Sequence, residues 1–148
     1  MKTVYRVLAY AIAALVAVQS AAIGYAVFAQ LHWIEGGGTI DAAAFESNAP
    51  GTAAMIFHAL NGGVVLLAAL ALLIVSFFAK IPQGVRWAVI VLVSTVVQIA
   101  LGTLSRLVAP IGAVHGAVAL VLFGVAVMAA MRVRKPAVVA ETVPEAVA

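Results

Sequence analysis

Four long apolar runs constrain the fold of this chain more than any other feature. They cover about residues 4–29, 53–79, 86–108 and 111–131. Each reaches or exceeds the roughly 20 residues that a helix needs to cross about 30 Å of hydrocarbon. The segments between them are polar, contain Gly or Pro, and are short apart from the first. The sequence therefore predicts an all-α fold, an integral membrane four-helix bundle over residues 1–135.

The composition supports a membrane protein over a soluble one. Hydrophobic residues make up 66% of the 148-residue chain and charged residues only 9%, which is more apolar surface than a core of this size can bury. The net charge of +3 comes from basic residues at the ends of the apolar runs. That placement favours the lipid bilayer as partner and argues against nucleic acid. Because the chain has no cysteine, disulfides, thiolate catalysis and iron–sulfur clusters are excluded.

The charges also predict an orientation. Cytoplasmic ends of membrane spans carry an excess of Lys and Arg, so both termini are expected in the cytoplasm and the protein in the inner (cytoplasmic) membrane as a multi-pass protein. The acidic residues Glu35, Asp41 and Glu46 fall on the opposite, outer side. Seven of the eight basic residues lie on the cytoplasmic side, namely Lys2, Arg6, Lys80, Arg86, Arg132, Arg134 and Lys135.

Two segments lie outside the predicted spans. The outer loop 30–51 contains Trp33 and Phe45, which are typical of a membrane interface, and a short amphipathic helix is predicted over 39–47 with Thr39 as its cap. This helix would cover the candidate site or dock a partner. The tail 136–148 has too little apolar surface to fold and is predicted to be a disordered cytoplasmic segment.

The first span has an alternative interpretation as a cleaved signal peptide, with Ala26 and Ala29 as the small residues of a cleavage site. Such sites place the two small residues two apart, whereas these are three apart. The apolar run is also longer than the 7–15 residues of a signal core. A retained span is therefore expected.

A weak internal repeat relates the two halves of the chain. Gln19 in the first span aligns with Gln98 in the third. Spans two and four each have a histidine near the outer end, followed by Gly62 in span two and by Gly116 in span four. The alignment needs one-residue slips, and apolar sequences repeat easily by chance, so both duplication and coincidence stay open. A true duplication would give two helix pairs related by a pseudo-twofold axis along the membrane normal.

The histidines are the main candidates for chemistry. His58 and His115 lie about five residues inside the second and fourth runs, roughly 6–9 Å from the outer helix starts at 1.5 Å per residue. Ionisable groups at this depth are costly and are functional candidates by default. Two imidazoles at one level in a bundle would ligate a haem iron from both faces. Gly62 lies four residues after His58, and Gly116 directly follows His115. These glycines leave room for a porphyrin, so haem b is the predicted cofactor.

Other roles for these histidines stay open. They would be neutral side chains whose hydrogen bonds are satisfied by Gln19, Gln98 or main-chain carbonyls. A non-haem metal would need a third ligand, and His32 would supply it only if the outer loop folded back. Gln98 belongs to a small polar face at helical spacing together with Gly102, and such a face is more typical of helix packing than of a proton path.

Two further residues are assigned to the predicted site. Arg106 is the one basic residue on the outer side, and its guanidinium fork suits a haem propionate; the alternative is that it reaches to the lipid headgroups. Asn61, one turn from His58, would donate to a group behind the ligands or to a neighbouring helix.

The pattern of histidines near the outer ends of spans two and four resembles one half of the haem A synthase fold. That resemblance covers all four spans and implies a b-type haem held between such helices. The family's catalytic glutamate is missing, because Met55, Ile56 and Phe57 precede His58, so synthase activity is not expected. Residues 57–62 (Phe-His-Ala-Leu-Asn-Gly) and 76–82 (Ser-Phe-Phe-Ala-Lys-Ile-Pro) also resemble a family of small uncharacterised four-span membrane proteins from actinobacteria, which implies no activity.

These observations predict a cytochrome b-like membrane protein with one bis-histidine haem near the outer face, acting in electron transfer or haem handling. It is more easily explained as a carrier than as an enzyme. A respiratory or other membrane complex is the expected partner, and self-association into a homo-oligomer is the other. The alternative function is a haem-free accessory subunit of a larger membrane complex. A transporter is disfavoured, because no span has an internal proline or acidic residue.

Overall fold

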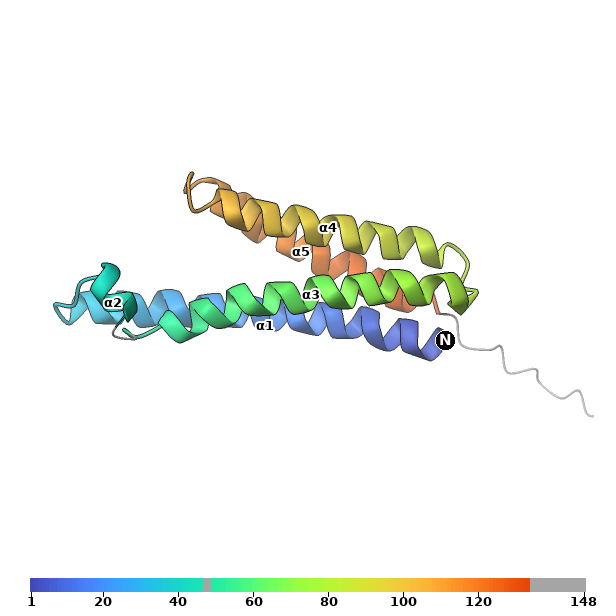
Figure 1. Cartoon of the computed structure of the whole chain (residues 1–148), viewed down its shortest axis with the longest axis horizontal. Coiled ribbons are helices and arrows are strands. Elements are labelled where there is room, and N and C mark those ends of the chain that lie inside the picture. Colours follow the sequence, from blue (N-terminus) through green and yellow to red (C-terminus); the bar gives the residue numbers. More distant parts are fainter. Residues whose placement is uncertain (47–48, 134–148) are drawn as a thin grey trace, which may run out of the picture.

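The computed structural model describes residues 1–46 and 49–133, and within them the chain forms helices and no strand (Figure 1). Four of these helices are long and apolar enough to cross a membrane. They pack as a four-helix bundle, which confirms the predicted all-α class. The tail 136–148 lies outside the described residues. The helices are α1 (Lys2–Glu35), α2 (Ala42–Glu46), α3 (Thr52–Ala79), α4 (Gly84–Leu104) and α5 (Ile111–Met131).

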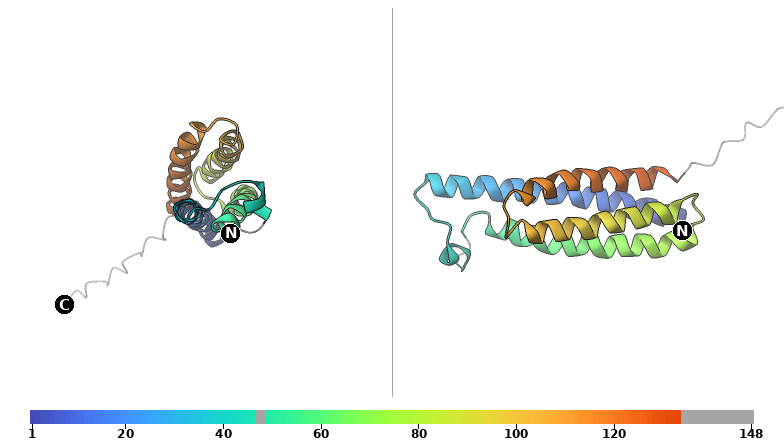
Figure 2. Two further views of the ribbon diagram at one scale, coloured as in Figure 1. Left: turned by 90° about the vertical axis from the view of Figure 1, so that its left-hand side faces the viewer. Right: turned by 90° about the horizontal axis from the view of Figure 1, so that it is seen from above.

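The four long helices run alternately in opposite directions. Each packs against two neighbours, in the order α1, α3, α4, α5 and back to α1, so α1 faces α4 and α3 faces α5 across the diagonals (Figure 2). One end of the bundle holds the start of α1, the turn between α3 and α4 and the end of α5; we call it the terminal end. The other, the loop end, holds residues 36–51 and the turn between α4 and α5.

Helix α1 ends at Glu35, later than the predicted residue 29. The apolar run stops there, but Gln30 and Glu35 are good helix formers, so the helix continues. It ends at two glycines: the Gly36 N–H donates to His32 O at 3.1 Å, and Gly37 has a φ of 89°, which glycine adopts without strain. The connection at the loop end therefore begins at residue 36 and not at residue 30.

Helix α4 ends at Leu104, earlier than the predicted residue 108. The Ser105 hydroxyl donates to Gly102 O at 2.8 Å, a local bond that competes with the helical backbone. Pro110 also disfavours a helical conformation in the residue before it. A turn over residues 105–107 takes the place of the predicted last helical turn.

The short helix near the loop end is shorter than predicted. Helix α2 starts at Ala42, so Thr39 is not its cap; the Thr39 hydroxyl instead contacts Asp41 Oδ2 at 3.5 Å. Trp33 donates its indole N–H to Thr39 O at 3.1 Å, which ties this segment to the end of α1. The last residue of the predicted helix, Ser47, lies outside the described residues, and so does the side chain of Phe45.

Gly51 sets the contact between the start of α3 and α1. Its φ is 89°, and a Cβ there would lie 2.6 Å from Ala26 O and 3.2 Å from Ala26 Cα. A side chain would therefore meet main-chain atoms that cannot move aside. The close approach of α3 to α1 at the loop end requires glycine.

The buried core fills the half of the bundle at the terminal end. The Tyr5 hydroxyl donates to Gly84 O at 3.0 Å, which joins the start of α1 to the start of α4. Many core residues are alanines, whose small side chains let helices approach closely. The core includes Ala9, Ile12, Val16, Val65, Ala69, Leu72, Ala88, Val91, Leu122, Ala126 and Ala129.

The half at the loop end is packed less closely. No residue of α4 after Thr95 is buried, and no residue of α5 before Leu122 is buried. The pair α1 and α3 diverges from the pair α4 and α5 toward this end (Figure 1). The polar side chains that the sequence placed in the apolar runs lie in this half.

Candidate functional site

His58 on α3 and His115 on α5 lie across one diagonal of the bundle, in its loop half. Their ring centroids are 6.1 Å apart and their planes are inclined by 65°. Both side chains are half-buried. The structure thus brings together the two histidines that the sequence singled out.

In each ring, Nδ1 lies against a main-chain carbonyl oxygen of a neighbouring helix. His58 Nδ1 is 3.2 Å from Gln19 O, and His115 Nδ1 is 3.0 Å from Gln98 O. A carbonyl oxygen only accepts, so Nδ1 must carry the proton and donate it. In the neutral ring, Nε2 then keeps a lone pair. Metal-ligating histidines have this arrangement, in which the second nitrogen donates to a carbonyl or carboxylate.

The two contacts are equivalent in the two halves of the chain. In the first half, the main-chain carbonyl of Gln19 on α1 accepts from His58 on α3. In the second half, the main-chain carbonyl of Gln98 on α4 accepts from His115 on α5. The predicted repeat aligned Gln19 with Gln98, and this geometry is the one that such a repeat requires. Duplication itself remains a prediction.

The side chains of the two glutamines differ. Gln98 Nε2 lies 2.9 Å from His115 O and 3.2 Å from His115 Nε2. The Gln98 amide therefore donates to the lone pair of His115. Among the described residues, neither the Gln19 amide nor any other group is hydrogen-bonded to His58 Nε2.

Each glutamine has a buried side-chain oxygen that lacks a donor. Gln19 Oε1 and Gln98 Oε1 are both buried without a hydrogen-bond partner among the described residues. Leaving such a group unpaired costs about 1–3 kcal/mol, and native structures rarely do so without a functional reason or an ordered water. Both oxygens belong to the residues that orient the histidines, so the polar groups of this site are incompletely satisfied.

Three glycines differ in how close they lie to the histidines. A Cβ on Gly102 would lie 3.0 Å from His115 Cε1 and 3.2 Å from His115 Nδ1. A Cβ on Gly62 would make an ordinary contact with Gln19 Nε2 at 3.6 Å, and one on Gly116 would meet nothing within 4 Å. Gly102, on the neighbouring helix, is the glycine that the His115 ring contacts.

The other residues singled out from the sequence lie away from the rings. Asn61 is buried and donates to Leu15 O at 3.4 Å, so it joins α3 to α1. Arg106 is exposed in the turn after α4. His32 lies in the last turns of α1, about 20 Å beyond Gln19 along the helix, so the idea of a third metal ligand from this residue is wrong.

The histidines form a pair without a third candidate ligand beside them in the described part of the chain. Within the described residues there is no group of three or more His, Cys, Asp or Glu side chains that would hold a bare metal ion. A metal held by two histidines needs its remaining ligands from another source, and a porphyrin supplies four nitrogens.

Sequence reasoning named Gln19, Gln98 and main-chain carbonyls as alternative hydrogen-bond partners of the histidines, and the structure shows such contacts. It assigned Gly102 to helix packing, whereas a Cβ on Gly102 would lie 3.0 Å from His115 Cε1. The spacing of four residues, which places Gly102 on the same helical face as Gln98, is the sequence signal that would have found it.

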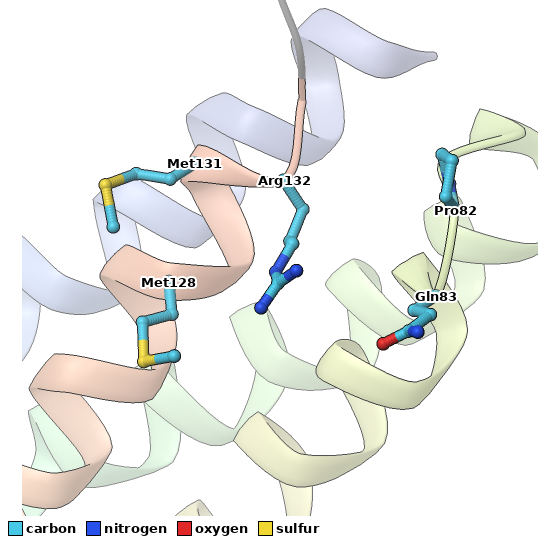
Figure 3. Close-up of a pocket in the computed structure, with 5 residues that line it drawn as sticks. All are labelled: Pro82, Gln83, Met128, Met131 and Arg132. Atoms are coloured by element: carbon cyan, nitrogen blue, oxygen red, sulfur yellow. The ribbon is translucent and has the colours of Figure 1, made fainter.

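A separate pocket lies at the terminal end of the bundle, between the end of α5 and the turn that joins α3 to α4 (Figure 3). The Arg132 guanidinium lies beside this pocket and 4.8 Å from the centre of the Trp87 ring, which is a cation–π contact. The pocket shares no residue with the histidine pair. It is lined by Pro82, Gln83, Met128, Met131 and Arg132.

Comparison of the chain with family models, with curated proteins and with solved structures gave no match.

Proposed function

We propose that this chain is a four-span membrane protein that holds one b-type haem between His58 and His115 and acts in electron transfer or haem handling. The observation that carries the proposal is the contact of each Nδ1 with a main-chain carbonyl oxygen, from which the tautomer of each ring follows. Both donate Nδ1–H to a main-chain oxygen, so both keep a lone pair on Nε2 for a metal.

The spacing of the rings fits one metal ion between them. Metal–imidazole bonds of about 2.0–2.1 Å, with about 1.2 Å from each nitrogen to its ring centre, give centroids roughly 6.4 Å apart. The observed separation is 6.1 Å. The distance between the ring centroids is therefore close to the one that axial ligation of a single metal ion would require.

The remaining packing is also compatible with a bound porphyrin. The loop half of the bundle lacks buried residues on α4 and α5, so the macrocycle does not compete with a formed core. One contact has to change: the Gln98 amide, 3.2 Å from His115 Nε2, lies at the nitrogen that a metal would use. Rotation of this side chain would free the lone pair.

In this proposal the bundle spans the inner (cytoplasmic) membrane with both termini in the cytoplasm. Support comes from the four helices of suitable length and hydropathy and from the distribution of charge. Lys2, Lys80 and Arg132 lie at the terminal end, whereas Glu35 and Asp41 lie at the loop end. The histidines are then near the outer face.

A bound haem would supply one-electron redox chemistry. Since the two histidines fill both axial positions, electron transfer fits better than oxygen activation. A respiratory or other membrane complex would be the electron partner, and self-association is a second route to an assembly.

Haem content is the direct test. The full chain, purified from a haem-supplied host, should give a pyridine haemochrome spectrum of b type and a reduced-minus-oxidised change in the Soret and α bands. His58→Ala and His115→Ala should each lower haem retention about tenfold or more, because one metal–ligand bond is lost, while the protein still inserts in the membrane.

His32→Ala is the matched control, since it removes a histidine about 20 Å away along α1. It should retain haem as the unaltered protein does. Full retention in His58→Ala or in His115→Ala would rule out axial ligation by that residue.

The second candidate function is a haem-free accessory subunit. The contact between the Gln98 amide and His115 Nε2 favours it, because this contact satisfies His115 without a metal. A colourless protein after haem-supplemented expression would support this alternative.

A further inference from the structure

The two candidate ligands are not equivalent, although their rings are held in the same way. His58 Nε2 has no hydrogen-bond partner among the described residues, whereas His115 Nε2 accepts from the Gln98 amide at 3.2 Å. The same amide donates to His115 O at 2.9 Å. Gln98 therefore holds both the main chain and the ring of His115 in place.

We propose that Gln98 is a positioning residue that makes His115 the exchangeable ligand of the pair, so that a small neutral ligand of the carbon monoxide class can replace it while His58 stays bound. This inference rests on the proposed haem site. It assigns to the site an open position that two strong axial ligands would not provide.

The competition for one lone pair is the physical reason. When His115 binds the metal, the Gln98 amide loses its acceptor on the ring. When His115 leaves the metal, its Nε2 accepts from Gln98 again, and that bond stabilises the dissociated state. His58 has no comparable group, so its dissociation leaves a lone pair without a donor.

A second observation concerns the side-chain oxygen of Gln98. This oxygen, Oε1, is buried and has no donor in the present arrangement. Rotation away from His115 Nε2 would give up that contact, whereas the unpaired oxygen has no hydrogen bond to lose.

The exchange balances without any other reactant. If a haem is bound, the bond between its metal and His115 Nε2 would break and the electron pair would return to the nitrogen, which would accept the Gln98 N–H. The incoming ligand would donate its own electron pair to the metal. No proton or electron is transferred, so the oxidation state of the metal is unchanged.

The test is carbon monoxide titration of the reduced, haem-loaded full chain. The unaltered protein should bind carbon monoxide. Gln98→Leu should bind it about 2- to 10-fold more weakly, the change expected from one hydrogen bond to the dissociated ring. Gln19→Leu is the matched comparison, because the Gln19 side chain makes no hydrogen bond to His58. An equal shift in both variants would overturn the role of Gln98.

Gly102→Ala provides a second variant with the opposite expected sign. Its Cβ would lie 3.0 Å from His115 Cε1, so it should push the ring off its position and raise carbon monoxide affinity. Gly116→Ala adds the same methyl group where nothing lies within 4 Å and should not change the affinity. A matching response in the two variants would contradict the proposal.

The two proposals fail in different ways. A colourless protein overturns the haem site itself. A protein that carries haem but binds no carbon monoxide, or that loses as much haem in His115→Ala as in His58→Ala, overturns only the exchangeable role of His115.

Discussion

At the scale of single residues, the side-chain oxygens of Gln19 and Gln98 are buried without a hydrogen-bond donor among the described residues. Each costs about 1–3 kcal/mol if it stays without a donor, yet both are buried. A glutamine at an ordinary helix contact would bond across to the next helix, as Asn61 does with Leu15 O. The two oxygens therefore leave this level of the bundle with polar groups that could accept further hydrogen bonds.

Arg106→Ala should weaken haem binding and lower the midpoint potential, because Arg106 is proposed to pair with a propionate and a nearby cation favours the more electron-rich reduced iron. The residue lies about two helical turns beyond Gln98, at the loop end. Redox titration of the purified protein measures the effect.

Arg86→Ala, at the other end of α4, is the control and should leave the potential unchanged. If the potential of Arg106→Ala also stays where it was, Arg106 only contacts the lipid headgroups or solvent.

The sequence predicted correctly that His58 and His115 lie close together, because this prediction needed only the depth of each histidine along its helix. His58 and His115 were placed at one level by counting along two apolar runs, and the rings meet at 6.1 Å. The sequence also named Gln98 as an alternative partner of the histidines, and Gln98 contacts His115. It did not assign Gly102 to the site, because the helical spacing of Gln98 and Gly102 gives their shared face but not the ring that this face meets.

At the scale of elements, hydropathy gave the existence of the helices and capping chemistry gave their ends. Helix α5 matches its predicted bounds, because Pro110 and Arg132 flank an apolar run that coincides with the helix. Helix α1 outlasts its apolar run and α4 stops short of its own. In both cases the end is set by glycine or serine hydrogen bonds, which an average over apolar side chains does not detect.

Gly51→Ala should destabilise the bundle by roughly 2–4 kcal/mol, the sum of a left-handed backbone and a main-chain collision. The φ of Gly51 is 89°, and the added Cβ would lie 2.6 Å from Ala26 O. Thermal unfolding in detergent gives the difference.

Gly37→Ala separates the two causes. Gly37 has the same φ of 89° but nothing within 4 Å of the added Cβ, so only the backbone cost of about 1–2 kcal/mol applies. Equal loss of stability in both variants would show that the contact with Ala26 contributes nothing.

At the scale of the whole molecule, the bundle is divided into a packed half and a half with little buried core. Tyr5, Leu72, Val91 and Leu122 are buried toward the terminal end, whereas the histidines and glutamines lie in the other half. The sequence predicts this division only in part. Apolar residues are less frequent at the loop end of each run, for example 9 of 13 in residues 53–65 against 13 of 14 in residues 66–79, but this does not show which side chains are buried. In a membrane, side chains that face lipid and side chains that face the core have the same composition.

Cysteine labelling tests the proposed orientation of the whole molecule. The chain contains no cysteine, so Glu35→Cys and Lys80→Cys each introduce a single thiol, at the loop end and at the terminal end. A membrane-impermeant maleimide added to intact cells should label Glu35→Cys and not Lys80→Cys.

After the cells are opened, both variants should react. Labelling of Lys80→Cys alone in intact cells would invert the topology and place the histidines near the cytoplasmic face.

The oxygens that accept from both imidazoles belong to the polypeptide backbone. A substitution at position 19 or 98 therefore changes the side chain there and leaves the accepting oxygen in place. The direction of the rings therefore does not depend on the side chains at positions 19 and 98, whereas the proposed exchange at His115 does depend on the Gln98 amide. An insertion within a helix has a different effect. One residue inserted between Tyr5 and Gln19 would rotate the rest of the helix by about 100° and carry the main-chain oxygen of Gln19 away from the His58 ring.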